Sequence, residues 1–380
     1  MDKTSLLDTE FNLDSSIIYL NHAAVSPWPA RTRDAVNAFA EENARLGSQN
    51  YLQWIETETT LRKNLQTLIN APSHQDIALV KNTSEALSIV AYGIKWEPGD
   101  NIVITSQEFP SNHIVWESLT SLGVELRIAN ISSSEGPTPE QSIFEQCNAR
   151  TRLIAVSSVQ YGTGLKMDLE SIGRFCKSEN ILFCIDAIQS IGALDFDVQR
   201  YQADFAMADG HKWMLGPEGL GFFYCADHVR DSLRLTQYGW HMIEDYGNFD
   251  VNNWQVARSA RRFECGSPNM LGIHALNASL SLIHEIGMPE IEQRVLDNTQ
   301  HMLDEIEQQE NLDLVSPASL DRLAGIVTFK PRHHSPKALY EKLMQQNIMC
   351  AERGGGVRFS PHFYTSQDKI RTAFDTANRL

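Results

Sequence analysis

Residues 204–225 read DFAMADGHKWMLGPEGLGFFYC, and this stretch decides the fold. It begins with an apolar run at 204–208 and ends with a second one at 221–225. Near-continuous apolar runs of this length are typical of strands that are buried on both faces of a sheet. The loop between them carries Asp209, His211 and Lys212. The stretch therefore predicts two buried strands that are joined by a polar loop.

The same pattern repeats on the N-terminal side of this stretch. Further apolar, β-rich runs lie at 77–80, 102–105, 125–129, 153–157 and 182–185. Helical patterns separate most of them, for example at 84–94 and 169–178. Strands that alternate with helices in this way form a mainly parallel sheet. We expect an α/β fold in which a mainly parallel, seven-stranded sheet is sandwiched by helices.

The pattern changes after residue 267. A long helical stretch at 271–309, broken near residues 287–289, is followed by strands at 325–329 and 357–360 and helices at 337–346 and 366–379. This order of elements is typical of a smaller α+β domain. We predict a large domain at 16–267, in which one or two amphipathic helices within 32–68 come before the sheet begins, and a small C-terminal domain at 268–380. Segment 1–15 is expected to join the small domain.

Composition and charge exclude several classes of protein. The 380 residues carry a formal net charge of -16, and no basic run exceeds Arg261-Arg262. Because nucleic-acid binders concentrate basic residues on one face, we expect no nucleic-acid partner. The N-terminal residues have no basic segment followed by an apolar core, and no apolar run approaches the length of a membrane span. We therefore expect neither a signal peptide nor a membrane segment.

The six cysteines are scattered and form no C-x-x-C pair. A zinc site or a disulfide framework is therefore disfavoured, and a reduced, cytoplasmic location is expected. The adjacent His333 and His334 are a weak ligand pattern that a surface loop explains better. We expect no metal.

Two polar motifs follow strands and have both a structural and a functional interpretation. Asn82-Thr83-Ser84 opens a helix after the first strand, where free backbone N–H groups and the helix dipole suit a phosphate. A plain helix cap is the simpler explanation of this motif alone. Phe109 follows the next strand, where an aromatic ring can stack on a flat ligand, although a core phenylalanine beside a turn is more common.

Three charged residues complete the set. Asp186 ends an apolar strand, where a carboxylate needs a partner such as a cationic ring nitrogen, unless it caps a helix. Lys212 lies in a loop with apolar neighbours, and a lysine near a cationic ring loses its proton easily and becomes a nucleophile. Arg358, flanked by apolar residues on a strand, suits a substrate carboxylate, although an interdomain ion pair is the more frequent role.

Taken together, these residues match the requirements of pyridoxal phosphate (PLP) chemistry. That chemistry needs a lysine that forms a Schiff base, an acid on the ring nitrogen, an anion cradle and a fork for the substrate carboxylate. In a doubly wound sheet, ligands bind at the carboxyl ends of the strands, which is where the candidate residues fall. We therefore expect PLP, held by Lys212, as the cofactor.

The motifs resemble those of the class V aminotransferase family, fold-type I PLP enzymes that include cysteine desulfurases, isopenicillin N epimerase and kynureninase. The most specific stretches are 208–213 with 216–221, supported by 186–190 and 262–269. The resemblance extends over almost the whole chain, from 19–24 to 358–364.

The resemblance implies a role for each matching residue. Lys212 would hold the cofactor and Asp186 would pair with its ring nitrogen. Gln189 would contact the ring oxygen and Phe109 would cover the ring. The phosphate would be held by the residues Thr83, Ser84 and His211, and by Ser267 of a second copy, which implies a homodimer. The substrate would be bound by Arg358, which takes its carboxylate, and by Ser158 and His22.

Two departures from the family pattern bear on the reaction. The interval 354–357 holds no cysteine, whereas desulfurases carry a nucleophilic cysteine on this loop, and Cys350 is expected to be structural. Asp209 stands where desulfurases usually have serine, so we expect it to point away from the phosphate or to bind substrate.

The sequence favours a class V aminotransferase that acts on the α-carbon of a small amino acid. The alternatives are an isopenicillin N epimerase-like epimerase, a lyase, or a desulfurase-like enzyme, the last disfavoured by the missing cysteine. A non-catalytic protein that binds PLP or another ligand is the alternative from another class, because a fold does not fix a function.

Overall fold

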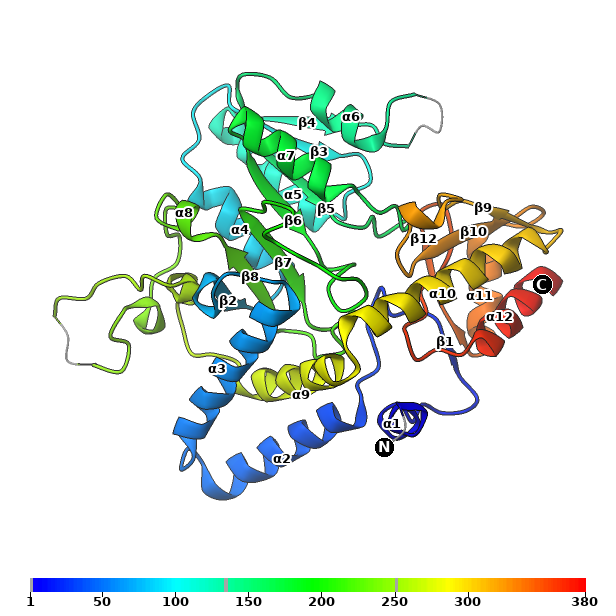
Figure 1. The fold of residues 1–380 in the computed structure, drawn as a ribbon, viewed down its shortest axis with the longest axis horizontal. Helices are drawn as coiled ribbons and strands as arrows, with labels where there is room; N and C mark the ends of the chain where they lie inside the picture. Colours follow the sequence, from blue (N-terminus) through cyan, green and yellow to red (C-terminus); the bar gives the residue numbers. More distant parts are fainter. Residues whose placement is uncertain (1–2, 133–135, 250–251) are drawn as a thin grey trace.

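The computed structural model describes residues 3–132, 136–249 and 252–380 (Figure 1). Its centre is a seven-stranded sheet in the order β2-β8-β7-β6-β5-β3-β4. The strands are β2 (Ile77–Val80), β3 (Asn101–Thr105), β4 (Glu125–Ala129), β5 (Thr151–Ser157), β6 (Leu182–Asp186), β7 (Phe205–Asp209) and β8 (Gly221–Cys225). Only β8 runs against its neighbours β2 and β7. The predicted α/β fold with a mainly parallel sheet is confirmed.

Helices cover this sheet in packed pairs. α4 (Thr83–Gly93) packs on α5 (Ser111–Glu117), and α6 (Pro139–Glu145) packs on α7 (Leu169–Glu179). Figure 1 shows three longer helices gathered below the sheet, where they contact one another: α2 (Ala30–Leu46), α3 (Tyr51–Leu68) and α9 (Met270–Ile286). A short α8 (Asp227–Arg230) follows β8. The near-continuous apolar strands are accordingly buried on both faces.

A second, smaller body lies to one side of the sheet (Figure 1). It contains the antiparallel sheet β12-β13-β10-β9 and the parallel pair β1-β11. Its elements are β1 (Ile18–Tyr19), β9 (Leu312–Leu314), β10 (Val327–Pro331), β11 (Ile348–Met349), β12 (Ala351–Arg353), β13 (Gly356–Phe359), α11 (Pro336–Gln345) and α12 (Gln367–Arg379). α10 (Met288–Glu307) runs between the two bodies, and α1 (Lys3–Glu10) contacts α2.

The apolar core is divided in the same way. One cluster of buried side chains surrounds the large sheet and includes α9, and a second cluster fills the small body. The second cluster also takes Leu20, because β1 pairs with β11 of the small body. The domain boundary at residue 268 stays a prediction. Among the described residues, no helix is long and apolar enough to cross a membrane.

Candidate active site

The candidate residues come together because parallel strands end at one edge of the sheet. Asp186 is the last residue of β6, and Lys212 lies three residues beyond the end of β7, the strand beside it. Phe109 follows β3, and Arg358 comes from β13 of the small body. The site is therefore assembled from both bodies, with the large sheet supplying most of it.

Lys212 is the amine of this site. Only 9% of the residue is exposed, and its Nζ atom lies 5.6 Å from the centre of the Phe109 ring. Within the described chain it makes neither an ion pair nor a side-chain hydrogen bond. Burial lowers the pKa of Lys212, an effect that the neighbouring Asp186 carboxylate opposes. A buried amine with a lowered pKa is a suitable nucleophile for an aldehyde.

Asp186 is the acid of this site and is 2% exposed. One of its oxygens accepts a hydrogen bond from the backbone N–H of Ile188 at 3.1 Å, and no helix begins there. Burial raises the pKa of Asp186, Glu108 and Asp209 add to that rise, and Lys212 counters it. A second cation beside this carboxyl group would favour its ionised form.

Glu108 anchors the loop that carries Phe109. Its buried carboxylate accepts hydrogen bonds from Thr105 Oγ1 (2.7 Å), Asn112 Nδ2 (2.7 Å) and the Ser157 backbone N–H (2.9 Å). These donors belong to β3, α5 and β5, so one carboxylate ties three elements together at the edge of the site. We did not identify this role from the sequence, because the donors are distant in the chain.

Arg358 is a buried cation without a carboxylate. It is 2% exposed, its Nη1 donates to the Tyr161 carbonyl at 2.7 Å, and its Nε has no partner. No aspartate or glutamate in the described ranges lies within ion-pair distance, so the interdomain ion pair considered from the sequence is not formed. Burial lowers the pKa of Arg358 to about 10. Such a guanidinium is suited to a carboxylate, and the binding of a substrate carboxylate by Arg358 stays a prediction.

Tyr161 is a further component of the site that the sequence did not reveal. Its carbonyl holds Arg358, and its ring packs edge-on against Phe109 with the centroids 5.1 Å apart. The signal in the sequence was an aromatic residue beside Gly162, just beyond a buried strand. Tyr161 thus connects the aromatic cover over Lys212 with the arginine of the small body.

The start of α4, the predicted phosphate cradle, is occupied by a side chain of this protein. Asp209 Oδ1 accepts hydrogen bonds from the backbone N–H of Thr83 and from Thr83 Oγ1, the latter at 3.0 Å. The Ser84 hydroxyl donates to Ser111 at 2.8 Å, and His211 Nδ1 lies 3.5 Å from Asp209 Oδ2. Asp209 thus points toward this cradle and not away from it, because the helix start attracts its negative charge, and the alternative that it binds substrate stays a prediction.

Two predicted contacts are already engaged within the protein. Gln189 Oε1 accepts from Trp213 Nε1 at 2.9 Å, and its Nε2 donates to the Ala23 carbonyl at 3.1 Å. One N–H of this amide remains for a ring oxygen. The His22 ring nitrogens contact the Ser360 carbonyl at 2.9 Å and the Tyr364 hydroxyl at 2.7 Å, and burial lowers its pKa to about 4. His22 therefore holds the chain in place, and its role in substrate binding stays a prediction.

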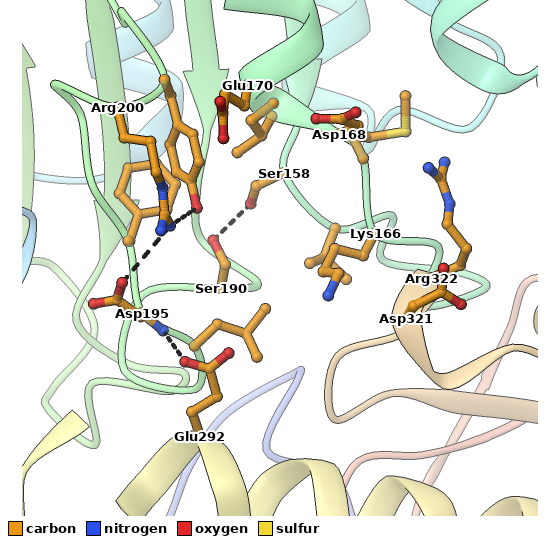
Figure 2. A pocket seen from close by; sticks show the side chains of 16 residues that line it. Ser158, Lys166, Asp168, Glu170, Ser190, Asp195, Arg200, Glu292, Asp321 and Arg322 are labelled. Carbon is orange, nitrogen blue, oxygen red and sulfur yellow. Dashed lines mark hydrogen bonds and ion pairs between the residues drawn. The ribbon is translucent and has the colours of Figure 1, made fainter. Parts of the chain in front are cut away.

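Ser158 lines a different pocket, of about 530 Å³ (Figure 2). Its hydroxyl contacts Ser190 at 2.7 Å, and Figure 2 shows this pair on one side of a space that Lys166 and Arg322 also line. Lys212 and Arg358 do not contribute to the lining. Ser158 therefore lines a pocket that Arg358 does not line, and its role in substrate binding stays a prediction.

Ser267 lies on an exposed loop after residues 260–263. It lines a separate pocket of about 290 Å³ with Cys265 and Asn269, and a side chain at Gly266 would meet nothing within 4 Å. Lys212 does not line this pocket. The predicted contact with a second copy stays a prediction.

A tight turn lies within the interval 354–357, where desulfurases carry the loop with the nucleophilic cysteine. β12 and β13 pair directly, and only Gly354 and Gly355 separate them, both with positive φ (61° and 81°). A Cβ atom on Gly354 would lie 2.2 Å from the Gly162 carbonyl oxygen, so the two loops touch. Cys350 lies between β11 and β12, is 2% exposed, and has a pKa that burial raises.

The residues of this site fit PLP. Lys212 offers an amine, Asp186 a carboxyl group for the ring nitrogen, and Phe109 an aromatic face. The Asp209 carboxylate marks the start of α4 as a place where an anion is stabilised. Arg358 and His211 each have a buried nitrogen without a hydrogen bond. These are the groups that the cofactor and an amino-acid substrate require.

Comparisons with known proteins agree with this geometry. Residues 18–377 match the model of the aminotransferase class-V family, so the chain belongs to that family. A probable cysteine desulfurase of Methanothermobacter thermautotrophicus is 28% identical over 96% of this chain and 94% of the relative. An uncharacterized aminotransferase of Bacillus subtilis, YcbU, is 27% identical over 86% and 84%.

Two solved structures are similar throughout. The apo cysteine desulfurase of Thermococcus onnurineus has a TM-score of 0.88 and 26% identity, over 99% of this chain and 97% of that one. The cystine C–S lyase C-DES, solved with its product cysteine persulfide, has a TM-score of 0.88 at 22% identity, over 96% and 98%, which shows the fold. The protein is thus a PLP-dependent enzyme of class V, as predicted, and the cofactor is PLP.

Proposed function

We propose that this enzyme cleaves the C–S bond of a cysteine-type amino acid by β-elimination, without a covalent step on a protein thiol. The observation that carries the proposal is the Gly354–Gly355 turn beside Arg358. Because only two glycines make up this turn, the turn itself presents no thiol to the site. The names of the relatives support a sulfur amino acid, and the lyase C-DES provides a precedent for the fold with this outcome.

The roles of the residues follow from their positions. Arg358 binds the substrate carboxylate as a fork, which fixes the orientation of the α-carbon. PLP, when bound, withdraws electrons from the α-carbon so that its proton becomes acidic. Lys212 takes that proton as a general base, and Asp186 keeps the ring nitrogen charged. Phe109 and Tyr161 exclude water from one side of the site.

With L-cystine the balanced reaction consumes one water. It breaks one C–S bond and gives cysteine persulfide, pyruvate and ammonia. The sulfur leaves with the electron pair of the broken bond, and no external oxidant or reductant is needed.

The test is a product analysis without any keto acid acceptor. Purified enzyme is incubated with a large excess of L-cystine or L-cysteine, and pyruvate, ammonia and released sulfur are measured. β-elimination gives many equivalents of pyruvate and ammonia per active site. Less than one equivalent of pyruvate and ammonia per active site, with both L-cystine and L-cysteine, would contradict this proposal.

The second candidate is the transamination that the sequence favoured. It is supported by the family that the chain belongs to and by the two-glycine turn between β12 and β13, which carries no cysteine. A transaminase without an acceptor stops after about one equivalent of keto acid per site, and a keto acid restores turnover. Epimerisation is recognised instead by loss of optical rotation without any keto acid.

We also infer a homodimer in which Ser267 of one copy reaches the phosphate of the other. The exposed loop at Gly266 and Ser267 supports this inference, together with the resemblance of residues 262–269 to the family. Sedimentation of the purified protein tests it, and a monomer that is fully active would contradict it.

A further inference from the structure

The feature from which this inference starts is the carboxylate of Asp209 at the N-terminus of α4. Its Oδ1 atom takes both hydrogen-bond donors of Thr83, the backbone N–H and the hydroxyl. These are donors that we expect to serve the phosphate of PLP. A phosphate monoester carries a charge of about −1.5 to −2 at neutral pH, so an ionised Asp209 opposes its binding.

The second oxygen of the same carboxylate is in a different situation. Oδ2 makes no hydrogen bond within the described chain, and His211 Nδ1 lies 3.5 Å from it. That nitrogen is itself buried without a partner. Asp209 is half-buried, and its second oxygen thus has no hydrogen bond next to the start of α4, beside an imidazole nitrogen that is also without one.

We propose that Asp209 takes up a proton when the phosphorylated cofactor binds, so that Oδ2–H donates to a phosphate oxygen while Oδ1 keeps its contacts with Thr83. The proposal concerns this chain in particular, since serine usually occupies this position in desulfurases. It rests on the expected placement of the phosphate at α4, and not on which reaction follows.

The charges around Asp209 are compatible with such an uptake. Burial raises its pKa, Thr83 and Lys212 lower it, and Glu218 raises it. His211 is held neutral, because burial lowers its pKa to about 4, with Lys212 adding to that effect. Asp209 in turn raises the pKa of Asp186, because the two carboxylates repel each other when both are ionised. The surroundings therefore place no permanent cation against Oδ2.

The experiment measures binding instead of turnover. The full-length protein is freed of cofactor and titrated between pH 7 and 9 with PLP and, separately, with pyridoxal, which lacks the phosphate. In this range the phosphate stays a dianion, and Lys212 and Asp186 act on both ligands alike. We expect the Kd for PLP to weaken by up to about tenfold per pH unit relative to the Kd for pyridoxal, the slope of one linked proton.

The variant Asp209→Asn keeps an acceptor for Thr83 and offers a permanent N–H donor to the phosphate. We expect it to remove the extra slope and to bind PLP about tenfold more tightly than wild type at the upper end of the range. Pyridoxal binding should not change. The exposed Glu218→Gln variant is the matched control, and it should retain most of the wild-type slope.

Two further measurements keep the proposal falsifiable. Calorimetry of PLP binding to the wild type in two buffers of different ionisation heat should show about one more proton taken up than for pyridoxal. Ser84→Pro removes one backbone donor where proline is tolerated, as Pro289 is in the first turn of α10. If Ser84→Pro weakens PLP but not pyridoxal, the phosphate lies at α4 whatever Asp209 does.

Parallel pH profiles for the two ligands, with no excess proton uptake, would overturn the proposal even if the Ser84→Pro result places the phosphate. Weaker PLP binding by Asp209→Asn at every pH would overturn it as well, because the ionised carboxylate would then be a favourable partner.

Discussion

Arg358 provides a prediction in which stability and activity move in opposite directions. Its guanidinium is 2% exposed, has a single hydrogen bond through Nη1 to the Tyr161 carbonyl, and meets no carboxylate in the described parts of the chain. Burial lowers its pKa from 12.5 to about 10, with Arg353 adding to the effect. A buried charge that has no carboxylate partner until substrate binds should make the substrate-free protein less stable.

The magnitude follows from the pKa. Keeping the Arg358 guanidinium charged in the folded protein, relative to the unfolded chain, therefore costs about 3 kcal/mol of folding free energy. The sign is destabilising: the cost is fully present below pH 10 and is relieved only as the pH rises through the lowered pKa. Arg358→Met removes the charge but also the hydrogen bond to Tyr161, worth about 1 kcal/mol. The cofactor-free variant should therefore unfold with a free energy about 1–2 kcal/mol higher than wild type.

Activity should change in the other direction. Loss of the charge-assisted fork to the substrate carboxylate should raise KM by about a hundredfold or more, since hydrogen bonds to charged groups contribute about 1.5–3 kcal/mol each. The assay is denaturant unfolding of the cofactor-free protein at pH 7.5, beside steady-state kinetics of the loaded enzyme.

Arg230 is the matched control, because it is as buried as Arg358 (4% exposed) but forms an ion pair with Asp76. Arg230→Met leaves a buried carboxylate without its partner and should cost about 3–5 kcal/mol. If Arg358→Met destabilises the protein as much as Arg230→Met does, the argument that Arg358 is an unpaired charge held for substrate is refuted.

The remaining predictions concern the turn, the amine and the thiols. Gly354→Ala should destabilise the protein by more than about 2 kcal/mol in denaturant unfolding, because its new Cβ atom would meet a carbonyl oxygen. Gly355→Ala, which has open space around it, should cost only about 1–2 kcal/mol. Equal costs for the two variants would contradict the close contact at Gly354. Only the neutral amine of Lys212 reacts with the aldehyde of PLP. The rate of PLP incorporation should therefore rise with pH until the lowered pKa of Lys212 is passed, and then level off. A rate that still rises steeply at pH 10 would show that the pKa of Lys212 is not lowered. Cys350→Ser and Cys265→Ser should each keep more than half of the wild-type kcat for sulfur release, and loss of activity in either would point to a thiol in the reaction.

The large sheet was predictable because its strands carry their own signal. β2 and β8 have the bounds expected from the sequence, since an apolar run that is buried on both faces needs no partner to be recognised. The short β9 was missed, because a three-residue strand has no periodicity and only its pairing with β10 makes it a strand.

The residues of the site also differ in whether a local sequence pattern reveals them. Lys212 and Asp186 were predictable because the sequence shows where each strand ends, and parallel strands end at one edge. The engagement of His22 depends on Ser360 and Tyr364, more than 330 residues away in the chain, and no local pattern reveals such contacts. That Asp209 points toward the start of α4 was not predicted, because the expectation considered the phosphate but not the attraction of a helix start for a carboxylate.

The measurement that tests the central claim most directly is the site of cofactor attachment. The purified, yellow protein is reduced with borohydride, digested, and the modified peptide is sequenced by mass spectrometry. The account predicts a phosphopyridoxyl group on Lys212 and no modification in a Lys212→Ala variant. A cofactor found on another lysine, or no modified peptide at all, would contradict it.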